Sequence, residues 1–325
     1  MKKKLIISAV CLLFITVFNF ALPRLMPGDT ALMLTGIDSE LAGNEQYEFY
    51  YEKIGADKPL AVQFGDYISG ILRGDLGYSF HENENVSTLI VKRLPATLQI
   101  ALPAIILSSL LAAVLGCIMG VRRKSPLRAV TTGAAIVCNA LPSFLVALLL
   151  ILLFSINLGI LPSNALNSVG YEAKGAMGRL ADRTVHLILP VLTLVLANFP
   201  AKYLMVLNTV TKQLDEKYVI YAKSRGISDL RIAFGHIFPN ICQPFLTMVG
   251  MNFGFILSGS LVIENIFSIK GMGSLISQAI AARDYPVLQG VLFVCALFTI
   301  IFTLLTDVVT TAIDPKVRCR VHEAE

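Results

Sequence analysis

Charged side chains are scarce in this sequence. They make up 15% of the 325 residues, whereas hydrophobic residues make up 55%, and the mean hydropathy is +0.70. A soluble domain carries about 25% charged residues, so this composition argues against a single water-soluble core. The surplus of apolar surface requires a second solvent, and the lipid bilayer provides it.

Signatures of catalysis and of nucleotide or metal binding are also missing. The sequence contains no Gly-x-x-x-x-Gly-Lys-Ser/Thr phosphate-binding loop and no Gly-x-Ser-x-Gly elbow, and the stretch 81–85 lacks the second histidine of a His-Glu-x-x-His zinc motif. The six cysteines include no Cys-x-x-Cys pair, and the four histidines are scattered. We therefore expect no ATPase site in this chain, no cofactor, no metal and no nucleic-acid partner.

Long apolar runs dominate the rest of the chain. A helix needs about 20 mostly apolar residues to span a bilayer, and its backbone must satisfy its own hydrogen bonds there. Six segments meet this length: 5–22, 96–121, 129–158, 185–210, 241–263 and 287–313. Four prolines in the second, third and fourth segments predict kinks: Pro103, Pro142, Pro190 and Pro200. The predicted fold is an all-α membrane protein with about six transmembrane helices.

Basic residues predict the orientation of these helices. Three lysines precede the first segment, which is long for a signal peptide and lacks an Ala-x-Ala site, so we expect this helix to be retained. With the N-terminus inside, the cytoplasmic pieces 1–4, 122–128, 211–240 and 314–325 hold 15 Lys and Arg. The outer pieces are more than twice as long but hold 11, so the positive-inside rule places both termini in the cytoplasm.

Polar segments divide the chain into two predicted parts. Residues 1–95 combine the first transmembrane helix with a long extracytoplasmic segment, and residues 96–325 form a core of five transmembrane helices. Inside the outer segment, apolar side chains at helical spacing predict a short amphipathic helix near the outer surface. These side chains are Leu60, Phe64, Tyr67, Ile68, Ile71 and Leu72.

The cytoplasmic loop 211–240 is too polar to enter lipid but is clearly patterned. Asp215 is the predicted N-cap of a helix, Gly226 predicts its end, and Ser228 with Asp229 predicts a second start. One face of the first helix is predicted to carry Leu214, Tyr218, Tyr221, Ala222 and Arg225. A solvated amphipathic hairpin would explain this pattern, but its exposed aromatic stripe favours a partner surface.

The apolar segments carry few groups that could couple transport to an ion gradient. Lys202 and Asp307 are the candidates, and each lies near the predicted cytoplasmic end of its helix, where we expect the side chain to snorkel to the interface. Small residues spaced by four at 116–120 and 250–258 predict close helix packing, within the chain rather than between subunits. A pathway-forming body without an energy source of its own suggests a partner that supplies energy.

Short motifs recur in order along the whole chain. The central ones are YVIYAKSRGIS at 218–228 and HIFPN at 236–240. The others are PGD at 27–29, DKPL at 57–60, RGDLGYS at 73–79, RLPATL at 93–98, LPSF at 141–144, ENIFS at 264–268, GMG at 271–273, ARDYP at 282–286 and DPK at 314–316. Together they resemble the dipeptide/oligopeptide/nickel family of ABC importer permeases, and the central ones resemble its EAA loop. Ile220 and Tyr221 depart from the general EAA pattern, and 268–270 replaces a more usual aromatic–proline pair.

The resemblance implies the B-type permease subunit of an ATP-driven importer in a bacterial or archaeal inner membrane, with the bundle of a type I ABC importer. It implies a second homologous permease subunit, two ABC ATPase subunits, an extracytoplasmic substrate-binding protein and membrane lipid as partners. It also implies coupling to the ATPases through the loop 211–240, at Tyr218, Tyr221, Ala222, Arg225, Gly226, Ser228 and Pro239. The expected cargo is a dipeptide, a longer peptide, nickel or another metal chelate.

A substrate path is expected among the second to fifth helices, which carry isolated polar residues. These are Asn139, Ser143, Asn198, Asn252 and Ser258. Buried Asn and Ser also hydrogen-bond between helices, so each of these residues has a structural alternative. A secondary carrier or channel acting alone is the competing functional class, which a stoichiometric ATPase partner would exclude. A membrane-bound enzyme is disfavoured because the catalytic groups are missing.

Overall fold

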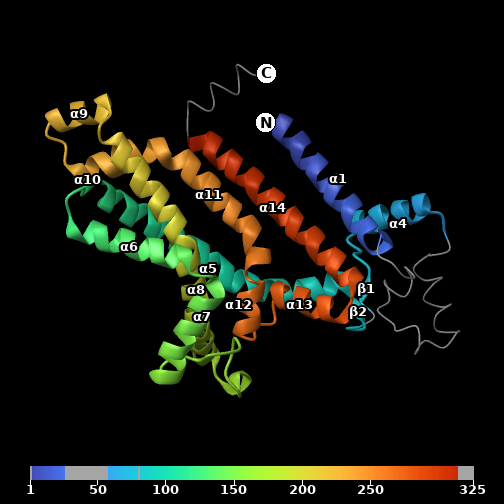
Figure 1. The fold of residues 1–325 in the computed structure, drawn as a ribbon. Coiled ribbons are helices and arrows are strands. Elements are labelled where there is room, and N and C mark those ends of the chain that lie inside the picture. Colours follow the sequence, from blue (N-terminus) through green and yellow to red (C-terminus); the bar gives the residue numbers. More distant parts are fainter. Residues whose placement is uncertain (1, 26–57, 80, 314–325) are drawn as a thin grey trace. The chain divides into compact units, whose positions relative to one another are not determined.

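A computed structural model of the chain describes residues 2–25, 58–79 and 81–313. It does not describe the side chains of residues 2–4, 254–259, 312 and 313. The PGD motif at 27–29 and the DPK motif at 314–316 lie outside the described residues, as does Asp57 of DKPL. The described part is almost entirely helical (Figure 1).

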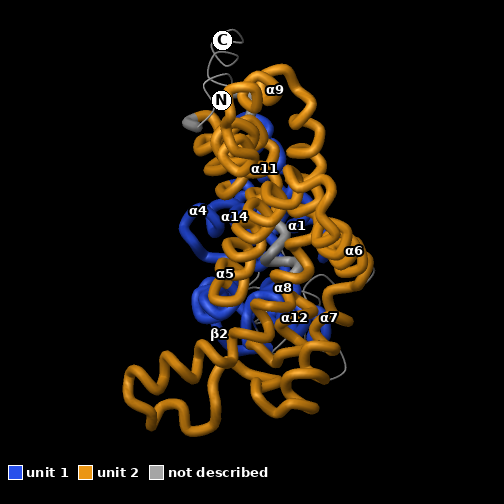
Figure 2. Tube along the Cα trace, turned by 90° about the vertical axis from the view of Figure 1, so that its left-hand side faces the viewer, with its two compact units in different colours: residues 1–97, 270–300 blue, residues 98–269, 301–325 orange. Residues whose placement is uncertain are grey.

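The fold divides into two compact units, which Figure 2 colours separately. Residues 1–97 and 270–300 form unit 1, and residues 98–269 and 301–325 form unit 2. The described helices of unit 1 are α1 (Lys2–Leu25), α4 (Leu60–Leu72), α13 (Met272–Ala282) and the first parts of α5 (Val86–Val121) and α14 (Tyr285–Ile313). Unit 2 holds the rest of α5 and α14 with α6 (Pro126–Ala140), α7 (Ser143–Leu150), α8 (Ala176–Gln213), α9 (Lys217–Ser224), α10 (Asp229–Ile232), α11 (Phe238–Gly259) and α12 (Leu261–Ile266).

Unit 1 is held together by polar contacts between segments far apart in sequence. The strands β1 (Tyr78–Ser79) and β2 (Glu84–Asn85) form a short antiparallel hairpin. Ser79 is fully buried, and its hydroxyl donates to the Asp284 carboxylate at 2.5 Å. The Thr97 hydroxyl accepts a hydrogen bond from the backbone N–H of Met272 at 2.8 Å. These bonds fix the hairpin and the start of α13 to the long helices of this unit.

The amphipathic helix predicted in the outer segment is present as α4. It packs on the last turns of α1, where the rings of Phe20 and Phe64 meet edge to face at 5.1 Å between centroids. The Arg24 guanidinium stacks over Phe20 and donates to the Gln63 side-chain carbonyl at 2.7 Å. The apolar spacing read from the sequence therefore gives a helix anchored to the first span.

The number of candidate spans agrees with the prediction of about six. Within the described residues, five helical stretches are long and apolar enough to cross a membrane: Leu5–Leu25, Val86–Val121, Ala176–Gln213, Asp229–Phe253 and Tyr285–Thr311. A sixth span is obtained if the bent pair α6–α7 is counted as one. Several predicted spans are too short, because α5 and α8 continue into polar sequence and the stretch Asp229–Phe253 begins within the predicted loop 211–240.

The third predicted span, 129–158, is not one helix. It is α6 followed by α7 and a π-helical turn, Ile151–Asn157, with a bend of 108° at the break. Leu141 at the break is extended, with φ −83° and ψ 131°. A proline ring disfavours the α-helical conformation at the residue before it, and with Leu141 extended, α6 ends before Pro142 and α7 starts after it. The predicted kink at Pro142 is thus a full break, whereas Pro190 and Pro200 lie inside the continuous helix α8.

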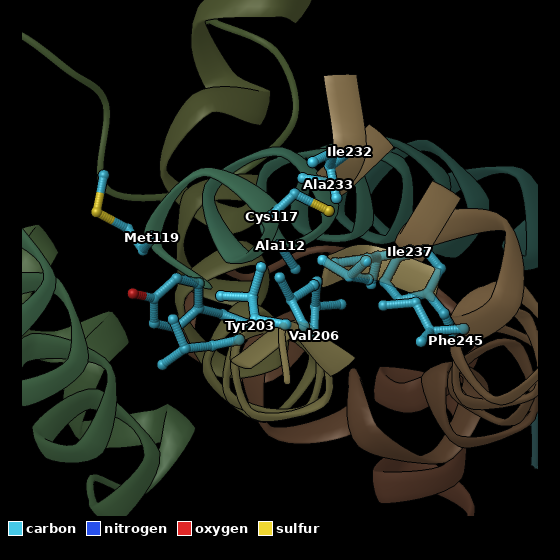
Figure 3. Packing of buried hydrophobic residues seen from close by; sticks show 14 of the residues in the cluster. Ala112, Cys117, Met119, Tyr203, Val206, Ile232, Ala233, Ile237 and Phe245 are labelled. Carbon is cyan, nitrogen blue, oxygen red and sulfur yellow. The ribbon is translucent and has the colours of Figure 1, made fainter. Parts of the chain in front are cut away.

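The core of unit 2 lies where α5 crosses α8. A cluster of buried side chains there includes Ala112, Cys117, Tyr203, Val206, Ile232, Ile237 and Phe245 (Figure 3). A Cβ added at Gly116 would lie 2.7 Å from the Val206 side chain, and one at Gly120 would lie 2.6 Å from Val210. Only glycine permits this approach, so the small residues at 116–120 serve packing within the chain, as predicted.

Candidate functional site

The segment between α8 and α11 forms a helix, a glycine turn and a second helix, as the sequence predicts. Glu216, rather than the predicted Asp215, is the N-cap of α9. Gly226 has φ +76°, and its N–H donates to the Lys223 carbonyl while the N–H of Ile227 donates to the Ala222 carbonyl. This pair of backbone hydrogen bonds is a Schellman motif, which requires the left-handed conformation that glycine adopts without strain. Ser228 is then the N-cap of α10.

One side of α9 is buried against its own chain. Val219 is fully buried and Ala222 is 5% exposed, and both belong to the hydrophobic cluster of unit 2. In that cluster they join Leu214 and Ile232, which flank α9 in sequence. The helix is therefore fixed to the long helices rather than suspended on a flexible loop. The sequence pattern grouped Ala222 with Tyr218 and Tyr221, but the structure buries Ala222 and leaves both tyrosines exposed.

The other side of α9 is an exposed surface rich in large apolar side chains. Tyr218 is 38% exposed, Ile220 56% and Tyr221 66%. The Arg225 guanidinium lies 6.0 Å from the centre of the Tyr221 ring, and the Tyr218 hydroxyl donates to the Gln213 side chain. The helix lies at one end of α8 and the 159–175 segment lies at the other (Figure 1). In the sequence, Ile220 stands out only as a departure from the EAA pattern. Its helical spacing from the buried Val219 and Ala222 nevertheless predicts that its side chain is exposed.

Three further residues of the predicted coupling set are solvent-accessible. Gly226 and Ser228 are exposed in the turn, and Pro239 is exposed in the first turn of α11. Six of the seven predicted residues are thus solvent-accessible within 218–239, and the seventh, Ala222, is buried.

A charged cleft lies at the base of α9. The loop 122–125 between α5 and α6 forms one wall, and Leu214, Asp215, Lys223 and Asp229 contribute to the rest of its lining. Arg123 donates to the Thr211 carbonyl at 2.5 Å and to the Asp215 carboxylate at 2.7 Å. The hydrogen bond from Arg123 holds the pKa of Asp215 below its usual range. The carboxylate is therefore charged at neutral pH and ties the loop to the segment that leads into α9.

The structure describes the side chains of four of the five predicted path residues. Asn139 is exposed on α6, and Ser143 is half-buried at the start of α7. The side-chain amides of Asn198 and Asn252 donate to the carbonyls of Leu194 and Met248, one turn back in the same helix. The Ser258 side chain lies outside the described residues. Among the described members, no side-chain hydrogen bond joins one of these residues to another.

Lys202 was expected to snorkel to the interface, and this expectation is wrong. Its side chain is fully buried inside unit 2, and the ammonium group donates to the Ser108 hydroxyl of α5 at 2.8 Å. Ser108 in turn donates to the Ile105 carbonyl at 3.1 Å. A charge buried in a membrane-spanning helix is costly, so the Lys202–Ser108 bond marks a specific contact between α5 and α8. Hydropathy alone could not reveal which way this side chain points.

Comparisons with known proteins match the chain over nearly its whole length. Residues 112–318 match the family described as the binding-protein-dependent transport system inner membrane component, and residues 1–101 match its N-terminal companion. A Brucella abortus protein named as a peptide transport system permease is 33% identical over 311 residues, which cover 94% of this chain and 95% of the relative. The glutathione transport system permease protein GsiC of Salmonella choleraesuis is 32% identical over 316 residues, 97% of each chain.

The helical fold and these matches define a multi-pass inner-membrane transport protein of bacteria. The chain belongs to the family of binding-protein-dependent transport system inner membrane components and is a permease subunit of an ABC importer. Subunits of this family are not themselves ATPases, and they work with ATPase and substrate-binding partners.

Proposed function

We propose that the chain carries peptides across the inner membrane as one of two permease subunits, together with two ATPase subunits and an extracytoplasmic binding protein. The cargo class is inferred from the relatives, one named for peptide transport and the other for transport of glutathione, which is itself a small peptide. Both relatives match along more than nine-tenths of the chain. ATP hydrolysis then belongs to the partner subunits, because the sequence lacks a phosphate-binding loop.

The exposed side of α9 is the proposed docking surface for an ATPase subunit. The observation that carries this proposal is the contrast between the two sides of one short helix. Val219 and Ala222 anchor it to the chain, while Ile220 and Tyr221 are more than half exposed. Exposed large apolar side chains on a polar loop are typical of a protein interface. Because α9 is anchored, a displacement imposed on it passes directly to α5, α8 and α11, which is the coupling that transport requires.

The proposed orientation places both termini and α9 in the cytoplasm, where ATP is available. It is supported by the basic residues of the loop 122–128 and of the segment 211–240. The proposed substrate path runs among α5, α6, α7, α8 and α11, with polar groups from Asn139, Ser143, Asn198, Asn252 and Ser258. The two asparagines bonded within their own helices would contribute their remaining amide groups.

Replacement of Tyr221 by aspartate tests the docking proposal. We expect normal amounts of inserted protein, because the side chain is 66% exposed and contributes little to the core. A charge in an apolar interface is costly when desolvated, so ATPase co-purification and peptide uptake should both fall by about tenfold or more. The measurement is pull-down of ATPase subunits from membranes, alongside uptake of a labelled peptide.

Val169→Asp is the matched control, since Val169 is also a fully exposed apolar residue but lies in the 159–175 segment, far from α9 along α8. It should leave association and uptake within twofold of the unmodified chain. Full association and uptake in Tyr221→Asp would show that α9 is a solvated connector and would contradict the proposal.

A further inference from the structure

The cleft at the base of α9 is a strongly basic feature beside the proposed docking surface. It encloses 510 Å³ and is lined by four basic residues, Arg122, Arg123, Lys124 and Lys223, and by two acidic ones, Asp215 and Asp229. Five of these six residues lie outside the candidate membrane spans, and Asp229 is the first residue of one. The charges therefore face water rather than lipid.

Both acidic residues of the cleft are already paired. Asp215 accepts from Arg123 at 2.7 Å, and Asp229 lies 3.4 Å from the Lys223 ammonium group. Lys223 also acts on Asp215 electrostatically, which adds to the lowering of its pKa. The first pair connects the loop 122–125 with the segment that leads into α9, and the second connects the last turn of α9 with the start of α10.

The other two cations of the cleft are Arg122 and Lys124. Both are exposed, and neither has an ion-pair partner within 2–25, 58–79 and 81–313. The positive-inside rule accounts for basic residues at this end of the helices. It does not account for their position in one cleft with a net positive charge, next to an exposed apolar helix. Such a surface favours an anionic partner at short range.

We propose that this cleft receives an acidic side chain of the ATPase subunit, as a second contact beside the apolar face of α9. The proposal rests on the proposed function, in which the ATPase docks on α9. Lys223 lines the cleft and lies in the last turn of α9, the same short helix that carries Tyr221, so a partner that docks on this helix lies next to the cleft. Apolar contact on α9 then provides affinity, and the charges of Arg122 and Lys124 fix the register of docking and speed the encounter.

The test uses the assembled importer and removes the two unpaired cations as Arg122→Gln/Lys124→Gln. The control, Lys212→Gln/Arg231→Gln, removes the same number of charges from exposed positions that do not line the cleft. ATPase retention on the immobilised permease pair is measured from low to high salt. We expect the cleft variant to bind about three- to tenfold more weakly at low salt and to lose most of its salt dependence. The control should stay within twofold.

Three results would overturn the proposal. In the first, the cleft variant retains the ATPase with unchanged affinity and unchanged salt dependence. In the second, both double variants weaken retention equally, which would indicate a diffuse effect of net charge. In the third, the cleft variant keeps the ATPase but loses phosphatidylglycerol from phosphatidylglycerol/phosphatidylcholine nanodiscs, which would make the cleft a lipid site. If Tyr221→Asp abolishes retention while the cleft variant does not alter it, α9 docking stands and only the cleft contact fails.

Discussion

Single residues decide how closely the helices of unit 2 approach each other. Gly116 and Gly120 were identifiable from their spacing, because small residues four apart permit close helix contact. The side chains that fill the space, Val206 and Val210, were not identifiable, since the partner helix depends on the tertiary fold. For the same reason the sequence could not show that Lys202 is buried or that Ala222 faces inward. Because Ala222 is buried in the hydrophobic cluster, Ala222→Asp is expected to disturb the core of the chain itself.

Gly116→Ala tests this packing. The added methyl group would lie 2.7 Å from Val206 and 3.3 Å from the backbone nitrogen of Leu207, so the helices must move apart. We expect the free energy of unfolding to fall by about 1–3 kcal/mol, as for other overpacked cores. The measurement is thermal unfolding of the purified permease in detergent.

Two further variants make that result specific. Gly133→Ala in α6 has no atom within 4 Å of the new methyl group and should be neutral or slightly stabilising. Val206→Ala combined with Gly116→Ala should recover part of the loss, because it removes the clashing Cγ1 atom of Val206 and leaves only its Cβ in close contact. Equal losses for Gly116→Ala and Gly133→Ala would indicate a general effect of glycine replacement instead of a close contact.

At the scale of elements, turn and break signals were more informative than hydropathy. Gly226, Ser228 and Pro142 each mark a boundary found in the structure, because each has a local conformational cause. Hydropathy predicted the existence of the spans but not their ends, since α8 begins at Ala176 and the stretch Asp229–Phe253 at Asp229, both in polar sequence. It also could not separate one long span from the bent pair α6–α7, which is apolar on both sides of the break.

Pro142→Ala tests the origin of that bend. With 1.5 Å per residue, spin labels at the exposed positions Val130 and Leu148 would be about 27 Å apart along a straight helix and about 17 Å apart across the 108° bend. We expect pulsed electron–electron distances near 17 Å in the parent and a shift towards 27 Å in the variant. Pro190→Ala, inside α8, should leave the α6–α7 distance unchanged. An unaltered distance in Pro142→Ala would mean that packing on α8 imposes the bend.

At the scale of the whole molecule, the chain supplies membrane-spanning helices and the anchored helix α9, which we propose to couple them to an ATPase subunit. The sequence alone was sufficient for the fold class and the family, because ordered motifs and six apolar runs extend along its length. It could not show that α9 buries Val219 and Ala222 in the core and leaves Ile220 and Tyr221 exposed. That division supports the proposal that the chain responds to a second protein and does not work alone.

ATP-driven peptide uptake into proteoliposomes tests this account most directly. The permease pair, its ATPases and its binding protein are reconstituted, and ATP is supplied only on the side that carries α9, with a non-hydrolysable analogue as control. We predict accumulation of labelled peptide above its external concentration with ATP, none with the analogue, and none when the permease carries Tyr221→Asp. Equal uptake with and without ATP would contradict the account and identify a carrier or channel that acts on its own.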